Sequence, residues 1–116
     1  MSKAATSVLV FSIYLFFLGA ILVAVPNLLL RVFGFPETGD VWIRVVGVLV
    51  LVLGYYYCNA ARNDVTAFLR WTVHGRFSVL AFFGVFVLLD FAPPTLILFG
   101  IIDAAAATWT AFALRS

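Results

Sequence analysis

Four apolar runs fill almost the whole of this 116-residue chain. The runs cover residues 6–25, 41–61, 72–91 and 95–114. The hydrocarbon core of a bilayer is about 30 Å thick, and about 20 helical residues span it. Each run is therefore long enough for a transmembrane helix, and the sequence predicts an all-α integral membrane four-helix bundle that occupies residues 1–116 as one domain. Residues 27–35, interrupted by Gly34, are predicted to form a short interfacial segment.

Composition and charge support a membrane location. Hydrophobic residues make up 66% of the chain and charged residues 10%, whereas a soluble domain averages about 25% charged. The formal charge of +2 is too small to indicate a nucleic-acid partner. With four spans, one side of the membrane holds Lys3, Arg62, Arg70, Arg76 and Arg115, and the other holds Arg31 and Arg44. Basic residues concentrate on cytoplasmic segments, so we predict an up-down-up-down bundle in the bacterial inner membrane with both termini cytoplasmic.

Few residues in this chain are suited to holding a cofactor. Cys58 is the only cysteine and His74 the only histidine. A single cysteine excludes both an internal disulfide and a Cys-x-x-Cys redox pair. The sequence also lacks a cluster of His, Cys and acidic residues at metal-ligand spacing. We therefore expect no cofactor and no metal bound within one chain, while a site shared between subunits stays open.

Two charges lie within the predicted spans, where charge is costly. Asp103 lies roughly 13 Å from the outer end of the fourth run, and Arg44 starts roughly 6 Å from the outer end of the second. A charge at the bilayer centre costs at least about 2.5 kcal/mol, so Asp103 needs compensation. It pairs with Arg44, or is protonated, or faces a water-filled pocket. Asp90 is the rival partner for Arg44, and it is predicted to cap the outer end of the bundle.

Two polar stripes mark the predicted interior. Three- and four-residue steps on the second run join Arg44, Gly47, Leu51, Gly54, Tyr55, Cys58 and Arg62. Comparable steps on the fourth run join Gly100, Asp103, Ala104, Ala107, Thr108 and Ala111. We predict a ligand-binding or structural polar site made of Arg44, Asp103, Tyr55, Asp90 and Trp109, with Tyr56 and Tyr57 in the inner aromatic belt. A second, cytoplasmic-side cluster is predicted from Arg62, Asp64, His74 and Arg76. No catalytic residue is predicted.

Several short motifs resemble those of the DoxX-like superfamily of small four-helix membrane proteins. They are Arg44 with Gly47 in the second run, Gly75 with Arg76 in the third, and the acid Asp103 in the fourth. The resemblance covers residues 28–114. It implies a four-helix membrane fold and a role beside oxidoreductases or as a chaperone-like membrane protein. Members commonly have glutamate where this chain has Asp103, which shortens the reach of the carboxylate.

Three functions remain open at this stage. The first is a non-enzymatic membrane protein that binds a lipophilic ligand or a partner protein through its intramembrane polar site. The second is a proton-coupled transporter or channel that uses Asp103, and the third is a membrane subunit of a quinone or sulfur oxidoreductase. A purely structural, oligomer-forming protein is the plain alternative. Gly19, Gly84 and Gly100 offer grooves for close helix contact, which favours a homo-oligomer.

Overall fold

A computed structural model describes residues 1–115, which form five helices and no strand. The helices are α1 (Lys3–Ala24), α2 (Pro26–Val32), α3 (Trp42–Arg62), α4 (Thr66–Leu88) and α5 (Leu96–Arg115). All except α2 are long and apolar enough to cross a membrane. The prediction of an all-helical chain with four membrane-length helices is confirmed.

Local chemistry explains where α1 begins and ends. Ser2 is the N-cap residue, and its hydroxyl accepts a hydrogen bond of 3.0 Å from the amide of Ala5. The helix ends before Val25, because the proline ring that follows disfavours a helical conformation at the preceding residue. Pro26 then opens α2 at the first helical position, where no amide donor is needed.

The ends of α2, α3 and α4 share one motif. Each is followed by a residue in the left-handed region: Gly34 at φ 75°, Asp64 at φ 52° and Asp90 at φ 60°. The next amide along the chain donates to a carbonyl in the last turn, as Phe91 does to Phe86 at 2.8 Å. This is the Schellman motif, which satisfies carbonyls that the helix leaves free. Asp90 therefore ends α4.

The turn after α3 is shorter than the sequence analysis expected. Val65 donates to the carbonyl of Ala60 at 3.0 Å, and α4 starts at Thr66, earlier than the predicted Thr72. Arg70 and Trp71 consequently lie inside a helix. The earlier start also moves Arg76 from the predicted end of the span to its middle, roughly 15 Å along α4.

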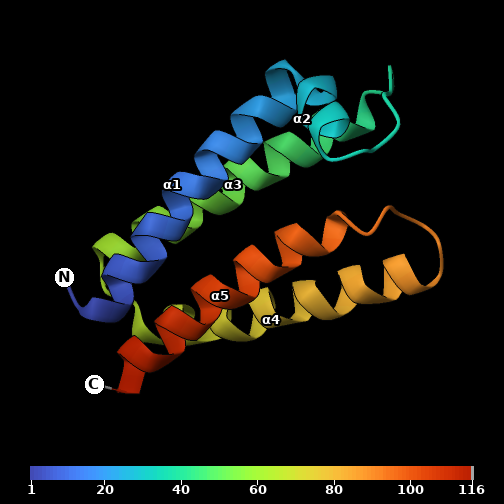
Figure 1. Cartoon of the computed structure of the whole chain (residues 1–116). Coiled ribbons are helices and arrows are strands. Elements are labelled where there is room, and N and C mark those ends of the chain that lie inside the picture. The colour runs from blue at the N-terminus through green and yellow to red at the C-terminus, as the bar shows by residue number, and fades with distance from the viewer. Residues whose placement is uncertain (116) are drawn as a thin grey trace.

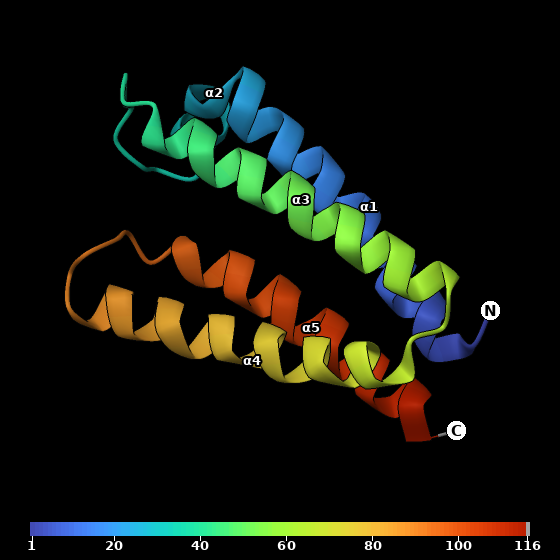
Figure 2. The ribbon, with the colours of Figure 1, turned by 180° about the vertical axis from the view of Figure 1, so that it is seen from behind.

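The long helices form two pairs (Figures 1 and 2). Helix α1 packs along α3, α4 packs along α5, and α1 with α5 makes most of the contact between the pairs. The start of α1, the turn after α3 and the end of α5 lie at one end of the molecule (Figure 1). We call it the basic end, because Lys3, Arg62, Arg70 and Arg115 lie there. Toward the other end, which holds α2, the two pairs diverge (Figure 2).

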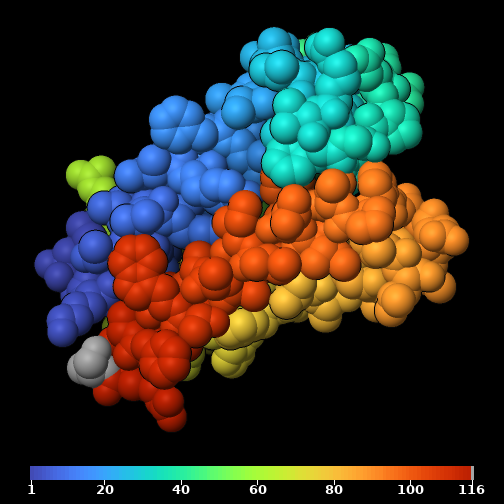
Figure 3. Space-filling model, in the orientation of Figure 1, coloured from blue at the N-terminus to red at the C-terminus, as the bar shows by residue number. Residues whose placement is uncertain are grey.

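The segment that contains α2 connects the two pairs where they diverge. The hydroxyl of Thr95 donates to the carbonyl of Phe33, and the rings of Phe33 and Phe99 have their centroids 4.7 Å apart. Figure 3 shows the atoms of this segment lying against those at the start of α5. The contact therefore joins the first helix pair to the second at the end opposite the basic end.

The burial pattern is that expected of a protein surrounded by lipid. Exposed side chains on the long helices are large and apolar, for example Phe17 at 69% and Leu88 at 84% exposed. The interior is built largely from small and hydroxyl side chains, including Ala5, Ser12 and Ala107. In water this arrangement would leave apolar patches far larger than monomers tolerate, whereas helices in lipid meet through small and polar residues.

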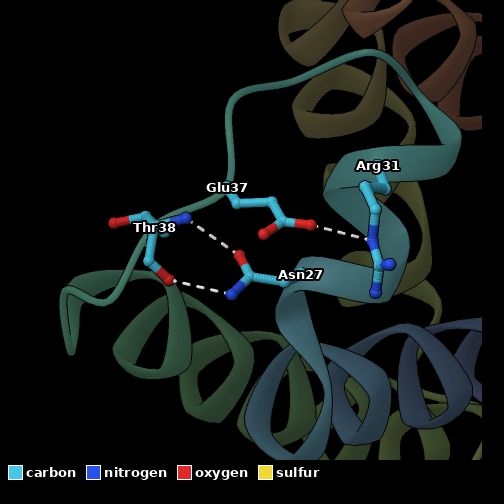
Figure 4. Close-up of polar contacts among 4 residues, drawn as sticks. All are labelled: Asn27, Arg31, Glu37 and Thr38. Carbon is cyan, nitrogen blue, oxygen red and sulfur yellow. Dashed lines mark hydrogen bonds and ion pairs between the residues drawn. The ribbon is translucent and has the colours of Figure 1, made fainter.

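Polar contacts within two pairs of residues hold the loop after α2 (Figure 4). The side-chain amide of Asn27 donates to the carbonyl of Thr38 at 3.1 Å and accepts from its amide at 2.9 Å. Arg31 and Glu37 form an ion pair of 2.9 Å, with both side chains more than half exposed. The Asn27 pair is partly buried, so we expect it to hold the loop more firmly than the ion pair does.

Replacing Asn27 with Ala should therefore loosen the loop. Loss of two hydrogen bonds, each worth about 0.5–1.5 kcal/mol, predicts roughly tenfold faster hydrogen exchange at the amide of Thr38. Mass spectrometry of deuterium uptake over residues 34–40 measures this. Glu37→Gln serves as the control, because an exposed ion pair contributes about 0–1 kcal/mol. Equal acceleration of hydrogen exchange in both variants would contradict the claim that Asn27 holds the loop more firmly than the ion pair does.

Candidate intramembrane polar site

Arg76 lies at the centre of the candidate site. Its side chain is 1% exposed although it lies near the middle of a membrane-length helix. Nε donates to the carbonyl of Thr72 at 3.1 Å, and Nη2 donates to the hydroxyls of Thr72 at 3.0 Å and Thr110 at 2.9 Å. The guanidinium carbon lies 4.9 Å from the centre of the Phe11 ring, a cation–π distance. Side chains of α1, α4 and α5 thus surround the charge.

Hydroxyl groups extend this network to α1. Thr110 shares a hydrogen bond of 2.6 Å with Ser7, and both hydroxyls are buried. Ser7 also donates to the carbonyl of Ala4 at 2.7 Å. Because one guanidinium, two threonines and a serine connect three helices, the network fixes where the two helix pairs meet.

Asp103 and two tyrosines complete the site. The rings of Tyr14 and Tyr57 have their centroids 5.3 Å and 6.0 Å from that of Phe11. Asp103 is partly buried and interacts electrostatically with Arg76 and with both tyrosines. We call Tyr14, Tyr57, Arg76 and Asp103 the central polar site. It combines a cation and two phenols around the Phe11 ring with an acid that interacts with all three.

Part of the hydrogen-bonding capacity of this site is unused. Nη1 of Arg76 and the hydroxyl of Tyr14 are buried and have no partner in residues 1–115. The Asp103 carboxylate forms no hydrogen bond or ion pair within the same residues. A buried donor without a partner costs about 1–3 kcal/mol. Any hydrogen-bond acceptor brought to either donor would therefore stabilise the site.

The expected pairing of Arg44 with Asp103 is wrong. Arg44 is exposed, and its Nη1 donates to the carbonyls of Val23 and, at 3.4 Å, Ala24. These carbonyls belong to the last turn of α1, where helix carbonyls lack intrahelical partners and attract cations. The long side chain of Arg44 thus reaches the end of the neighbouring helix instead of the interior of the bundle.

The prediction that Tyr55 is the inward-facing tyrosine of α3 is also wrong. Tyr55 is 60% exposed and Tyr56 is 55% exposed, whereas Tyr57 is the tyrosine of α3 that packs inward. The Tyr57 ring contacts Phe68 edge-on, with a centroid distance of 5.7 Å, as well as Phe11. The true inward face of α3 contains the buried residues Gly47, Gly54, Ala60 and Ala61.

Two other predicted site residues lie away from the central polar site. Asp90 is exposed and ends α4, at the end of the molecule opposite the basic end, whereas Asp103 lies within α5. Trp109 is 47% exposed and lines a shallow groove of about 350 Å³ with Lys3 and Thr6. Neither contributes a side-chain hydrogen bond or ion pair among the described residues.

The four residues of the predicted cytoplasmic-side cluster are not brought together. Asp64 binds the start of α1, where its carboxylate accepts from the amide of Ser2 at 3.1 Å and from its hydroxyl at 2.7 Å. Arg62 is exposed at the end of α3, and His74 is exposed on α4. Arg76 is the buried cation described above.

Sequence reasoning missed the tyrosine and hydroxyl partners of Arg76. The signal is hydroxyl residues within apolar runs, which in membrane helices mark contacts between helices. The residues that carry it are Ser7, Ser12, Thr72 and Thr110. Thr72 and Arg76 are four residues apart, a spacing that places them on one helical face once α4 is known to begin at Thr66.

The described part of the chain holds no group of three His, Cys or acidic residues arranged to bind a metal ion. Cys58 is a free, partly buried thiol. Comparison with protein-family models, with curated proteins and with solved structures found no match for the chain. The case for a function therefore rests on the geometry of the central polar site.

Proposed function

We propose that the protein is a non-enzymatic integral membrane protein that binds a lipophilic molecule through the central polar site. The observation that carries this proposal is the pair of buried, unpartnered donors, Nη1 of Arg76 and the hydroxyl of Tyr14. Hydrocarbon offers these groups no acceptor, so a polar oxygen of a bound molecule would be stabilised by a hydrogen bond from either of them.

The site favours a small, neutral head group. Arg76 and Tyr14 supply donors, while Asp103 supplies an acceptor that repels an anion. A carbonyl or hydroxyl oxygen on an apolar molecule satisfies both requirements. Phe11, Tyr57 and Phe68 supply the aromatic surface beside the site, with ring contacts of 5.7–6.0 Å. Ligand sites of this kind combine mostly apolar walls with a few polar groups that fix orientation.

One observation favours a second candidate, a proton-coupled transporter or channel. The Asp103 carboxylate has no hydrogen-bond partner in residues 1–115 and lies within a membrane-length helix. Acidic residues inside membrane helices often carry protons.

We also propose a family and a membrane setting for the chain. The motifs at Arg44, Arg76 and Asp103 support membership of the DoxX-like superfamily. The concentration of basic residues supports an up-down-up-down bundle in the bacterial inner membrane, with the basic end and both termini cytoplasmic. The exposed helix faces could contact a second copy of the chain, a partner protein or an oxidoreductase, and each of these remains a proposal. Gly19 and Gly100 lie against Leu51 and Leu80 of the same chain, whereas Gly84 faces open space and is free for such a contact.

The test is to identify what co-purifies with the protein. The full chain is extracted in mild detergent, and its bound small molecules are identified by mass spectrometry. We expect the wild type to retain an apolar molecule with a carbonyl or hydroxyl group, and Tyr14→Phe to lose most of it. Tyr55→Phe is the matched control, because Tyr55 is 60% exposed on α3 and should leave retention unchanged.

Tyr14→Phe should also change the stability of the ligand-free protein. Removing an unpartnered buried hydroxyl should raise the free energy of unfolding of delipidated protein by about 1 kcal/mol. Thermal unfolding of both forms in detergent measures this. If Tyr14→Phe keeps the full amount of co-purified ligand, the binding proposal fails. If Asp103→Asn abolishes proton uptake into vesicles while ligand retention is unaffected, the proton-coupled transporter replaces the binding protein as the proposed function.

A further inference from the structure

A second site, separate from the central polar site, lies on the outer surface of α4 and α5. A groove of about 480 Å³ runs between these helices near the basic end. Arg70, His74 and Arg115 line it, and all three are exposed. None of the three side chains forms an ion pair or hydrogen bond within residues 1–115. No acidic residue lines the groove, so its positive charge is uncompensated.

The rest of the lining is mainly apolar and lies deeper in the membrane. Phe77 is roughly 10 Å from Arg70 along α4, and Thr108 is roughly 10 Å from Arg115 along α5. Val73, Ala111 and Leu114 form the floor between these positions. The groove thus has a cationic mouth at the end of the helices and an apolar channel that extends toward the middle of the membrane.

We propose that this groove binds an anionic phospholipid. The phosphate lies between the guanidinium groups of Arg70 and Arg115 and the imidazole of His74, and an acyl chain lies along the floor. Arginine suits this role, because its planar donors match phosphate oxygens. Basic grooves between membrane helices at the cytoplasmic face attract the head groups of anionic lipids. This binding is independent of the ligand proposed for the central polar site.

The first test compares phosphatidylglycerol with phosphatidylcholine. Native mass spectrometry of the full chain in mild detergent, titrated with each lipid, gives the two affinities. Each basic residue near a membrane surface contributes about 1 kcal/mol to anionic lipid binding, so Arg70→Gln and Arg115→Gln should each weaken phosphatidylglycerol binding about fivefold. Arg62→Gln is the matched control: it is exposed at the same end but lies outside the groove, and less than a twofold change is expected.

A second variant tests the apolar floor. Ala111→Leu adds bulk to the groove without changing charge, and we expect it to weaken phosphatidylglycerol binding while thermal unfolding shows that the fold is kept. Three outcomes would overturn the proposal. They are equal weakening by Arg62→Gln, equal affinity for phosphatidylcholine, and unchanged binding in the Ala111→Leu variant. If glycerol phosphate competes at the affinity of the whole lipid, the site recognises phosphate alone, and the lipid proposal is likewise rejected.

Discussion

Neutralising Asp103 and Arg76 together should cost much less stability than the sum of the two single changes. Asp103→Asn removes the acid that interacts with the buried guanidinium, and Arg76→Gln leaves the carboxylate without its cation. Each single change leaves an uncompensated charge in a poorly solvated site. Because the two groups are not in direct contact, we expect a loss of about 2 kcal/mol, less than the roughly 3–5 kcal/mol for breaking a buried ion pair. In the double variant neither charge remains, so the coupling energy should be about 1–3 kcal/mol. Unfolding in mixed micelles with increasing dodecyl sulfate measures the stability of the two single variants and of the double variant.

Arg44→Gln provides the control for this cycle. Arg44 donates to the carbonyls of Val23 and Ala24 and forms no ion pair in residues 1–115. Combining Arg44→Gln with Asp103→Asn should therefore be additive within about 0.5 kcal/mol. A coupling of Asp103 to Arg44 larger than that to Arg76 would mean that the carboxylate is compensated from α3 and not from α4. The central polar site would then be wrongly composed.

Hydropathy predicted the long helices because their length and apolar content reflect the bilayer itself. The start of α4 was missed because hydropathy reports only the apolar part of a helix. The stretch from Thr66 to Trp71 includes Arg70, which lowers the local hydropathy, although an arginine near a helix end satisfies its charge at the membrane surface. An accurate start for α4 required the turn at Asp64, which no apolar pattern reveals.

The inward face of α3 was predicted from the wrong residue. The sequence interpretation assumed that Arg44 points inward, and this assumption brought Tyr55 inward with it. Arg44 instead donates to the last turn of α1, so its position does not indicate which face of α3 points into the bundle. Gly47 and Gly54 are better guides, because both are buried against α1 and a Cβ atom at either position would be crowded by α1. Together with the buried Ala60 and Ala61, the two glycines define a face that includes Tyr57 and leaves Tyr55 outside.

The partner of Asp103 was missed because of an error in the helix boundary. An acid within an apolar run is easily recognised as a candidate functional residue. Recognition of Arg76 depends on depth, and the late predicted start of the third span assigned it to the membrane surface. The hydroxyl network of Thr72, Thr110 and Ser7 depends on three helices meeting at one level, which follows from packing and not from local sequence.

The contact between α1 and α3 should be the most sensitive part of the fold to a small substitution. Gly19 and Gly47 allow the two backbones to approach closely. A Cβ atom at Gly47 would lie 2.8 Å from the Cβ of Leu22 and 2.9 Å from the backbone nitrogen of Val23. Both atoms are fixed to the backbone of α1, so they move away only if the helices separate. We therefore expect Gly47→Ala to lower the free energy of unfolding by about 2 kcal/mol, within the range of overpacked cores.

Gly84→Ala separates this packing effect from the general effect of removing a glycine. A Cβ atom there has no neighbour within 4 Å, and alanine favours the helix by about 1 kcal/mol. Gly84→Ala should thus be neutral or slightly stabilising, whereas Gly47→Ala should unfold at a lower dodecyl sulfate fraction. A Gly47→Ala protein as stable as the wild type would mean that α1 and α3 are not held at this separation. In that case the hydrogen bonds from Arg44 to the end of α1, which depend on the same approach, would also have to be reconsidered.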